Sequence, residues 1–240
     1  LVTLGDINST KYGDTLGKIS CHRHLYEKVR GFDEAMEGYG MEDFDLVNRL
    51  VKASDTQVFI QNPVHLRFIS HSNEERIKNY QFVKNLESIY VNVSGVDESE
   101  KKVLYTMKDN TWSEMAFKFN AKYQGIKALS FDGWYIERSG YKQGTVQRNG
   151  NGFKLVENGL HFHKEKNGQL QSSSENSEHG TWQEIPYDSP LYTSMILSYS
   201  DCLNRLIYQE NTALNNPINP GGWGNGTVYL NFDYSKPIVI

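Results

Sequence analysis

The sequence predicts an α/β fold for the first third of this 240-residue chain, followed by a β-rich antiparallel module. In the first third, short apolar runs alternate with amphipathic helical patterns, as they do in α/β folds. After residue 103, short alternating runs are divided by Asn-Gly pairs, which are the strongest short-range signal for β-hairpins. A polar stretch at residues 94–102 separates the two patterns, so we predict one domain at 1–95 and another at 103–240.

The elements of the first domain follow from periodicity. Phe44, Val47, Leu50 and Val51 recur at helical spacing, which predicts a helix over residues 41–53 with one buried face. A weaker helical pattern covers residues 74–89. The other expected elements are a strand at 17–21, a helical turn at 22–29, and strands at 57–60 and 64–69.

The second domain is predicted as an antiparallel sandwich or meander. Its expected hairpins turn at the Asn-Gly pairs 149–150, 158–159 and 167–168. A helix is expected over residues 191–208, and a strand near 226–233.

Composition excludes several classes of function. The net charge is −4 and no basic cluster is present, so the sequence does not predict a nucleic-acid-binding protein. No apolar run approaches the ~20 residues of a transmembrane helix, so we expect no transmembrane segment in this chain. The two cysteines lie far apart and do not indicate a disulfide framework. We therefore predict a cytoplasmic location, with peripheral attachment to a membrane as an alternative.

The most informative stretch is a glycine-punctuated loop that leads into the predicted helix, with Gly38-Tyr39-Gly40-Met41-Glu42-Asp43 at its end. Carboxylates in the first helical turn are favoured by exposed amides and by the helix dipole. Glycines let a ligand approach the backbone closely, and a tyrosine ring can stack on the apolar face of a sugar. Acidic residues also occupy first turns for stability alone, so position by itself does not assign a function.

The order of motifs over residues 17–73 resembles the acceptor-side segment of inverting glycosyltransferases of the GT-A fold, the family 2 and galactosyltransferase-like members. The resemblance rests on Gly31-Phe32-Asp33-Glu34, on the loop at 38–43, and on a strand end at Phe68-Ile69-Ser70-His71. Two positions depart from the family, which usually has tryptophan at Tyr39 and often has glycine at Met41. The resemblance implies the C-terminal part of a Rossmann-like nucleotide-sugar transferase domain.

The same resemblance implies roles for individual residues. Asp43 is expected to be the general base, and His71 is expected to bind the catalytic Mn²⁺ (or Mg²⁺). A methionine ligand found three residues earlier in animal galactosyltransferases is replaced by Phe68. The residues expected to bind the acceptor are Glu42, Tyr39, Gly40 and Asp45.

The resemblance also implies a nucleotide-sugar donor, a UDP-sugar, and a glycan acceptor such as a surface polysaccharide. Only sixteen residues precede Gly17, so we expect the donor half of the enzyme to be missing from this chain and the chain alone to be inactive. Asp43-Phe44-Asp45 fits the Asp-x-Asp pattern, but it begins a helix in the acceptor motif and is not that donor-side motif.

Two other interpretations stay open. The first is a non-catalytic carbohydrate-binding β-module, with aromatic stacking in the second domain and a relic transferase segment. The second is an accessory β-domain that only supports a catalytic domain. His161 and His163 alternate along an expected strand, and without nearby cysteines or clustered acids we expect a solvent-facing pair rather than a metal site.

Overall fold

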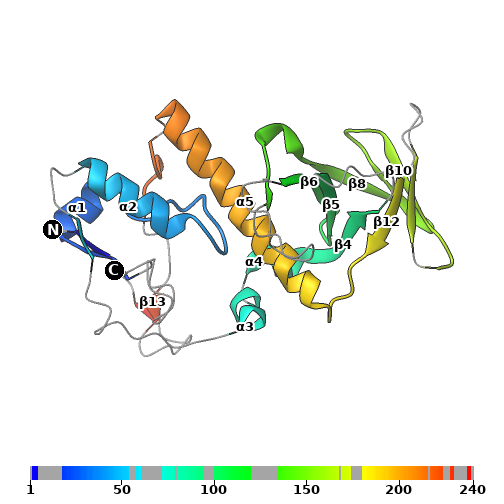
Figure 1. The fold of residues 1–240 in the computed structure, drawn as a ribbon, viewed down its shortest axis with the longest axis horizontal. Coiled ribbons are helices and arrows are strands. Elements are labelled where there is room, and N and C mark those ends of the chain that lie inside the picture. Colours follow the sequence, from blue (N-terminus) through cyan, green and yellow to red (C-terminus); the bar gives the residue numbers. More distant parts are fainter. Residues whose placement is uncertain are drawn as a thin grey trace. The chain divides into compact units, whose positions relative to one another are not determined.

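The computed structural model describes residues 2–4, 18–53, 58–60, 72–78, 80–93, 100–119, 134–167, 169–173, 180–215, 217–223, 228–229 and 237–238. These residues form two compact units (Figure 1). The first unit draws on residues 1–37, 41–69 and 207–240, and the second on 38–40 and 70–206. No helix within the described ranges is long and apolar enough to cross a membrane.

The first unit contains a small mixed sheet, two helices and the last turns of a third helix, residues 207–214. Strand β1 (Val2–Leu4) pairs antiparallel with β2 (Ser20–Cys21) and parallel with β3 (Val58–Ile60). Helices α1 (Arg23–Lys28) and α2 (Glu42–Ala53) enclose a core that includes the side chains of Leu25, Val29, Leu46 and Leu50. Helix α2 buries one face through Leu46, Val47 and Leu50, whereas Phe44 and Val51, which were expected on that face, are 44 % and 38 % exposed. A short antiparallel pair, β13 (Val228–Tyr229) and β14 (Pro237–Ile238), also belongs to this unit.

The second unit is dominated by antiparallel strands, with the helices at its two sequence ends. Helix α3 (Asn73–Ile77) begins with a capping box, in which Ser72 and Glu75 satisfy each other's backbone amides. Helix α4 (Gln81–Asn85) follows, and α5 (Pro190–Leu214) contributes its residues up to Leu206. The strands are β4 (Leu86–Asn92), β5 (Glu100–Met107), β6 (Thr111–Phe119), β7 (Trp134–Tyr135), β8 (Tyr141–Asn149), β9 (Gly152–Leu155), β10 (Leu160–Lys164), β11 (Leu170–Ser173) and β12 (Gly180–Glu184), with a 3-10 turn, η3, at Arg138–Gly140.

Eight of these strands close into an antiparallel barrel. The order is β5-β4-β12-β11-β10-β9-β8-β6, and β6 pairs back with β5. The ring closes through β4 and β12, where Tyr90 lies opposite Glu184 and Asn92 opposite Trp182. Strand β7 continues the edge of β6 beyond β8. Closure removes the exposed strand edges that an open sheet would leave.

The barrel buries apolar side chains on both its inner and outer faces. Each of the eight strands contributes to an inner cluster. Eight strands enclose a space that side chains alone can fill. The members of this cluster are Tyr90, Leu104, Trp112, Val146, Phe153, Leu155, Phe162, Leu170 and Trp182.

The alternate residues of β5 point outward, so Val103, Tyr105 and Met107 pack in a second cluster with Met195 and Ile196 of α5. Figure 1 shows α5 beside β4, β5 and β6. Strand β5 is therefore buried on both faces, because one face lines the barrel and the other is covered by the helix.

The predicted fold class, an α/β Rossmann-like domain followed by a β-rich module, is wrong for this chain. The described residues form mainly a closed eight-stranded antiparallel barrel, and the only parallel pairing among them is that of β1 with β3. The expected sandwich or meander has the right hairpins at 149–150 and 158–159, but its ends are joined. Part of the helix expected at 74–89 is strand β4, because that segment pairs with β5 and β12.

Candidate functional site

The first turn of α2 carries the acidic residues that the sequence singled out. Helix α2 begins at Glu42, and the backbone amide of Asp45 donates a 2.8 Å hydrogen bond to the carbonyl of Met41. Met41 adopts φ +70°, a left-handed conformation that costs energy for a residue with a side chain. This bend feeds Glu42 and Asp43 into the helix terminus, where its dipole favours negative charge.

Glu42 and Asp43 are both half-buried in the first unit. One carboxylate oxygen of Glu42 is shielded from solvent. A carboxylate that remains partly accessible, and that lies at a helix N-terminus, can accept a proton from a hydroxyl group brought within hydrogen-bonding distance. The local geometry therefore allows the role expected of Asp43.

Asp45 lies in a different environment from its two neighbours. It is only 3 % exposed, and its Oδ2 accepts hydrogen bonds from Nε and Nη2 of Arg49 at 2.8 and 2.6 Å. Nη1 of Arg49 donates to the carbonyls of Val29 and Gly31 at 2.6 and 2.7 Å. This arrangement joins the end of α1 to α2. Asp45 therefore orients Arg49, which holds the backbone at Val29 and Gly31.

Residues 38–40 lie against α5 within the second unit. The backbone amide of Tyr39 donates to Oγ of Ser200 at 2.7 Å, and Nδ2 of Asn204 donates to the carbonyl of Gly40 at 2.7 Å. A Cβ atom at Gly38 would lie 2.3 Å from the Ser200 hydroxyl oxygen. Glycine suits this close approach to α5, because Gly38 adopts φ +78°. The close approach of a sugar, which was expected from the sequence, stays a prediction.

The ring of Tyr39, the expected sugar-stacking platform, carries a cation. The guanidinium carbon of Arg76 lies 4.7 Å from the ring centroid, and Tyr39 is 38 % exposed. This distance is typical of a cation–π contact. A sugar that stacked on the same face of the ring would have to displace Arg76.

Sequence patterns did not reveal the residues that hold the preceding loop, 31–34, in the first unit. Asn219 is buried and adopts φ +48°. Its Nδ2 donates to the carbonyls of Arg30 and Phe32, and its Oδ1 accepts from the amide of Glu34. Asp33, which is 5 % exposed, accepts a 2.8 Å hydrogen bond from Asn211. These partners are almost two hundred positions away in sequence, and no local motif marks them.

A metal site was expected at His71. His71 and Phe68 lie outside the described residues. Among the residues that are described, no group of three or more histidine, cysteine, aspartate or glutamate side chains could hold a metal ion. His161 and His163 are both exposed on β10, as expected of a solvent-facing pair.

Comparison with known proteins identifies one region. Residues 8–73 match the family model described as the N-terminal domain of galactosyltransferase. No curated protein matches the chain, and no solved structure matches it. The matched segment contains the acidic turn of α2 and His71, so the chain carries a galactosyltransferase-like region. The match does not bear on the family 2 assignment or on a missing donor half.

Proposed function

We propose that this chain belongs to a metal-dependent, inverting glycosyltransferase that transfers a sugar from a UDP-sugar to a hydroxyl group of a glycan. The proposal rests on a family match and an acidic helix terminus that lie in the same segment of the chain. The galactosyltransferase-like match covers residues 8–73, and within it Glu42 and Asp43 lie half-buried at the N-terminus of α2. The cytoplasmic location predicted from composition remains a prediction.

In this proposal Asp43 is the general base. Inverting transfer needs a carboxylate that removes the proton of the acceptor hydroxyl as that oxygen attacks the anomeric carbon of the donor. Glu42, Tyr39, Gly40 and Asp45 would help to bind the acceptor. Among these, Asp45 would act through Arg49, which fixes the loop that carries residues 31–34.

A divalent cation, Mn²⁺ or Mg²⁺, would stabilise the diphosphate leaving group as a Lewis acid. Only His71 is proposed here as a ligand, by its position within the matched segment. Imidazole is the commonest side-chain ligand of metal ions in proteins.

The test is replacement of Asp43 in the full-length gene product, with UDP-galactose as the donor and a panel of β-linked oligosaccharides as acceptors. Asp43→Asn should lower kcat by about 10²–10⁴-fold, the usual contribution of a general base, with little change in KM. Glu74→Gln is the matched control, because Glu74 is an exposed carboxylate in the first turn of α3. Turnover of Asp43→Asn within a few-fold of wild type would remove Asp43 from the mechanism.

Metal dependence is tested separately. Treatment with EDTA should abolish transfer, and added Mn²⁺ should restore it. His71→Ala should raise the Mn²⁺ concentration that gives half-maximal activity. Full activity in EDTA would refute the metal-dependent part of the proposal.

A further inference from the structure

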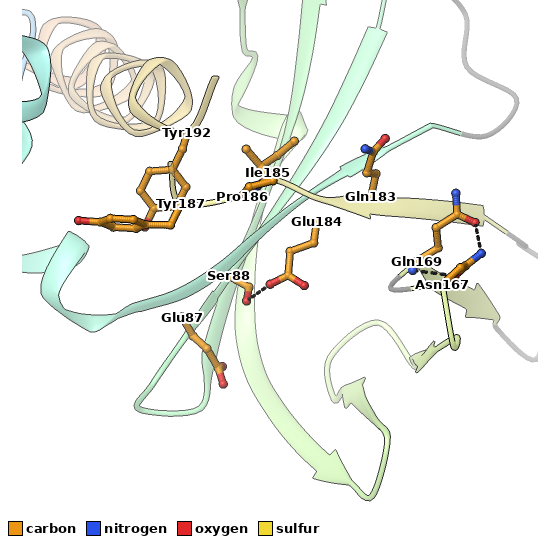
Figure 2. Close-up of a pocket in the computed structure, with 10 residues that line it drawn as sticks. All are labelled: Glu87, Ser88, Asn167, Gln169, Gln183, Glu184, Ile185, Pro186, Tyr187 and Tyr192. Carbon is orange, nitrogen blue, oxygen red and sulfur yellow. Dashed lines mark hydrogen bonds between the residues drawn. The ribbon is translucent and has the colours of Figure 1, made fainter. Parts of the chain in front are cut away.

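A cavity in the second unit lies outside the galactosyltransferase-like region. Its volume is about 600 Å³, within the ~300–1,000 Å³ typical of small-ligand sites. The cavity lies between β4, β12, the turn before β11 and the segment that leads into α5 (Figure 2). Its lining includes Glu87, Ser88, Asn167, Gln169, Glu184 and Tyr187.

Polar side chains in this cavity are held in place by their neighbours. Oε1 of Glu184 accepts a 2.8 Å hydrogen bond from Ser88. Nδ2 of Asn167 donates to Oε1 of Gln169 at 3.0 Å, and Oδ1 of Asn167 accepts from the Gln169 backbone amide at 2.9 Å (Figure 2). Carboxylates and amides that are already oriented lose less rotational freedom when a ligand binds.

The two carboxylates of the cavity are already balanced by cations. Oε2 of Glu184 lies 3.1 Å from Nζ of Lys164, and Glu87 forms an ion pair with Arg148. The Glu184 carboxylate raises the pKa of Lys164, chiefly through their hydrogen bond. Neither cation is among the lining residues that the structure describes. The cavity therefore offers acceptor oxygens without a large net charge, which disfavours both anionic and strongly cationic ligands.

An exposed aromatic ring completes the cavity. Tyr187 is 81 % exposed, the highest fraction among the large apolar side chains that are described. Its ring lies 5.1 Å from the ring of Tyr192, which belongs to α5 and is buried (Figure 2). Such a supported ring presents apolar surface to solvent at little conformational cost.

We propose that this cavity is a second carbohydrate site. It binds a neutral pyranose unit of a glycan by stacking on Tyr187 and by hydrogen bonds to Glu184 and to the side-chain amides of Asn167 and Gln169. A pyranose ring has one relatively apolar face and a rim of hydroxyl groups that both donate and accept. The pairing of a tyrosine ring with fixed carboxylate and amide groups fits that surface. This inference does not depend on the transferase proposal, because it requires neither nucleotide nor metal.

The test is saturation-transfer-difference NMR on the whole 240-residue chain, without nucleotide or metal. The probes are three neutral oligosaccharides, lactose, maltotriose and cellotriose, with trigalacturonic acid as the anionic comparator. We expect saturation transfer to at least one neutral sugar, and Tyr187→Ala should weaken its binding by about tenfold. Tyr187 is so exposed that this change should leave the thermal unfolding midpoint unaltered.

Two matched controls separate the cavity from the rest of the barrel. Val156→Ala removes an exposed apolar side chain outside the cavity and should leave binding unchanged. Glu184→Gln should weaken binding, whereas Glu137→Gln should not, although Glu137 is also paired with a lysine.

Several results would overturn the inference. The first is the absence of NMR saturation transfer to every neutral sugar. The second is equal sugar binding by Tyr187→Ala and wild type. The third is tighter binding of trigalacturonic acid than of the neutral sugars. A soluble galactan in an affinity-electrophoresis gel distinguishes a polymer from a free sugar as the natural ligand. Retained glycosyl transfer by Tyr187→Ala, together with lost sugar binding, would leave the proposed function untouched.

Discussion

Nδ2 of Asn204 in α5 donates a 2.7 Å hydrogen bond to the backbone carbonyl of Gly40, which stands two residues before the acidic turn of α2. Asn204 is only 2 % exposed, so water cannot replace this bond easily. Together with the bond from the Tyr39 amide to Ser200, it fixes the backbone of residues 39–40. The loop that the sequence marked as important is thus held by a helix from the far end of the chain.

Removal of the Asn204 amide should destabilise the protein. Asn204→Ala leaves the Gly40 carbonyl without this donor, and we expect a loss of about 1–3 kcal/mol in the free energy of unfolding. Urea denaturation followed by circular dichroism measures it. Gln209→Ala is the control, because Gln209 lies on the same helix and is exposed. Equal effects of the two substitutions would mean that the hydrogen bond contributes nothing measurable.

The left-handed backbone of Met41 should respond to glycine. At φ +70° a side chain is strained, so Met41→Gly should stabilise the protein by about 1 kcal/mol. Met41→Ala separates strain from packing, since alanine loses the side chain but keeps the Cβ atom. Only the glycine variant should raise the urea midpoint. A glycine variant no more stable than the alanine variant would argue against strain at this position.

The buried pair of Asp45 and Arg49 should show strong coupling. The two side chains are 5 % and 16 % exposed, and Arg49→Met would leave the Asp45 carboxylate buried without its cation. We expect a cost of about 3–5 kcal/mol, part of which Asp45→Asn should recover in the double variant. Urea denaturation of the four proteins in this cycle gives the coupling energy.

An exposed ion pair with the same spacing provides the control for that cycle. Arg23 and Glu27 are also four residues apart in a helix, but their side chains are 89 % and 45 % exposed. Arg23→Met should therefore change the free energy of unfolding very little, because solvent screens such a pair. A similar loss in the free energy of unfolding for Arg49→Met and Arg23→Met would show that burial of the Asp45–Arg49 pair does not strengthen it.

Cys202 should make stability depend on pH in the alkaline range. Burial raises the pKa of the Cys202 thiol to about 12, from an ordinary value of 9.0. Well below pH 9 the thiol is protonated in both folded and unfolded chains, so its contribution is constant. Above that pH the unfolded thiol loses its proton first, and stability should fall by about 1.4 kcal/mol per pH unit until the folded thiol ionises as well.

The comparison with Cys202→Ala isolates this effect. The free energy of unfolding of wild type minus that of the variant should be constant from pH 7 to about 8.5 and should then decline. The pKa of the buried Tyr105 hydroxyl is also raised, chiefly by burial and in lesser part by Cys202, so most of its contribution is common to both proteins. A difference that stays flat up to pH 10.5 would show that Cys202 is accessible to ionisation in the folded chain.

Local sequence determined the elements whose physics is local. Helix α2 was predicted at its observed position because its apolar residues recur at helical spacing and acidic residues occupy its first turn. The hairpins joining β8 to β9 and β9 to β10 were predicted from Asn-Gly pairs, and Gly150 and Gly159 adopt the positive φ angles that such turns need. The position of Glu42 and Asp43 in the first turn of α2 likewise followed from the pattern of the loop.

Only the tertiary structure decided what these elements assemble into. A strand shows the same alternation of apolar and polar residues in an open sandwich and in a closed barrel. The sequences of β4 and β12 therefore did not predict that these two strands pair and close the ring. The pair Asp45–Arg49 has a spacing that sequence can recognise, but its burial depends on the backbone of α1. The bonds from Asn204 to Gly40 and from Asn219 to the loop at 30–34 cross more than 160 residues, and such contacts exist only once the chain has folded.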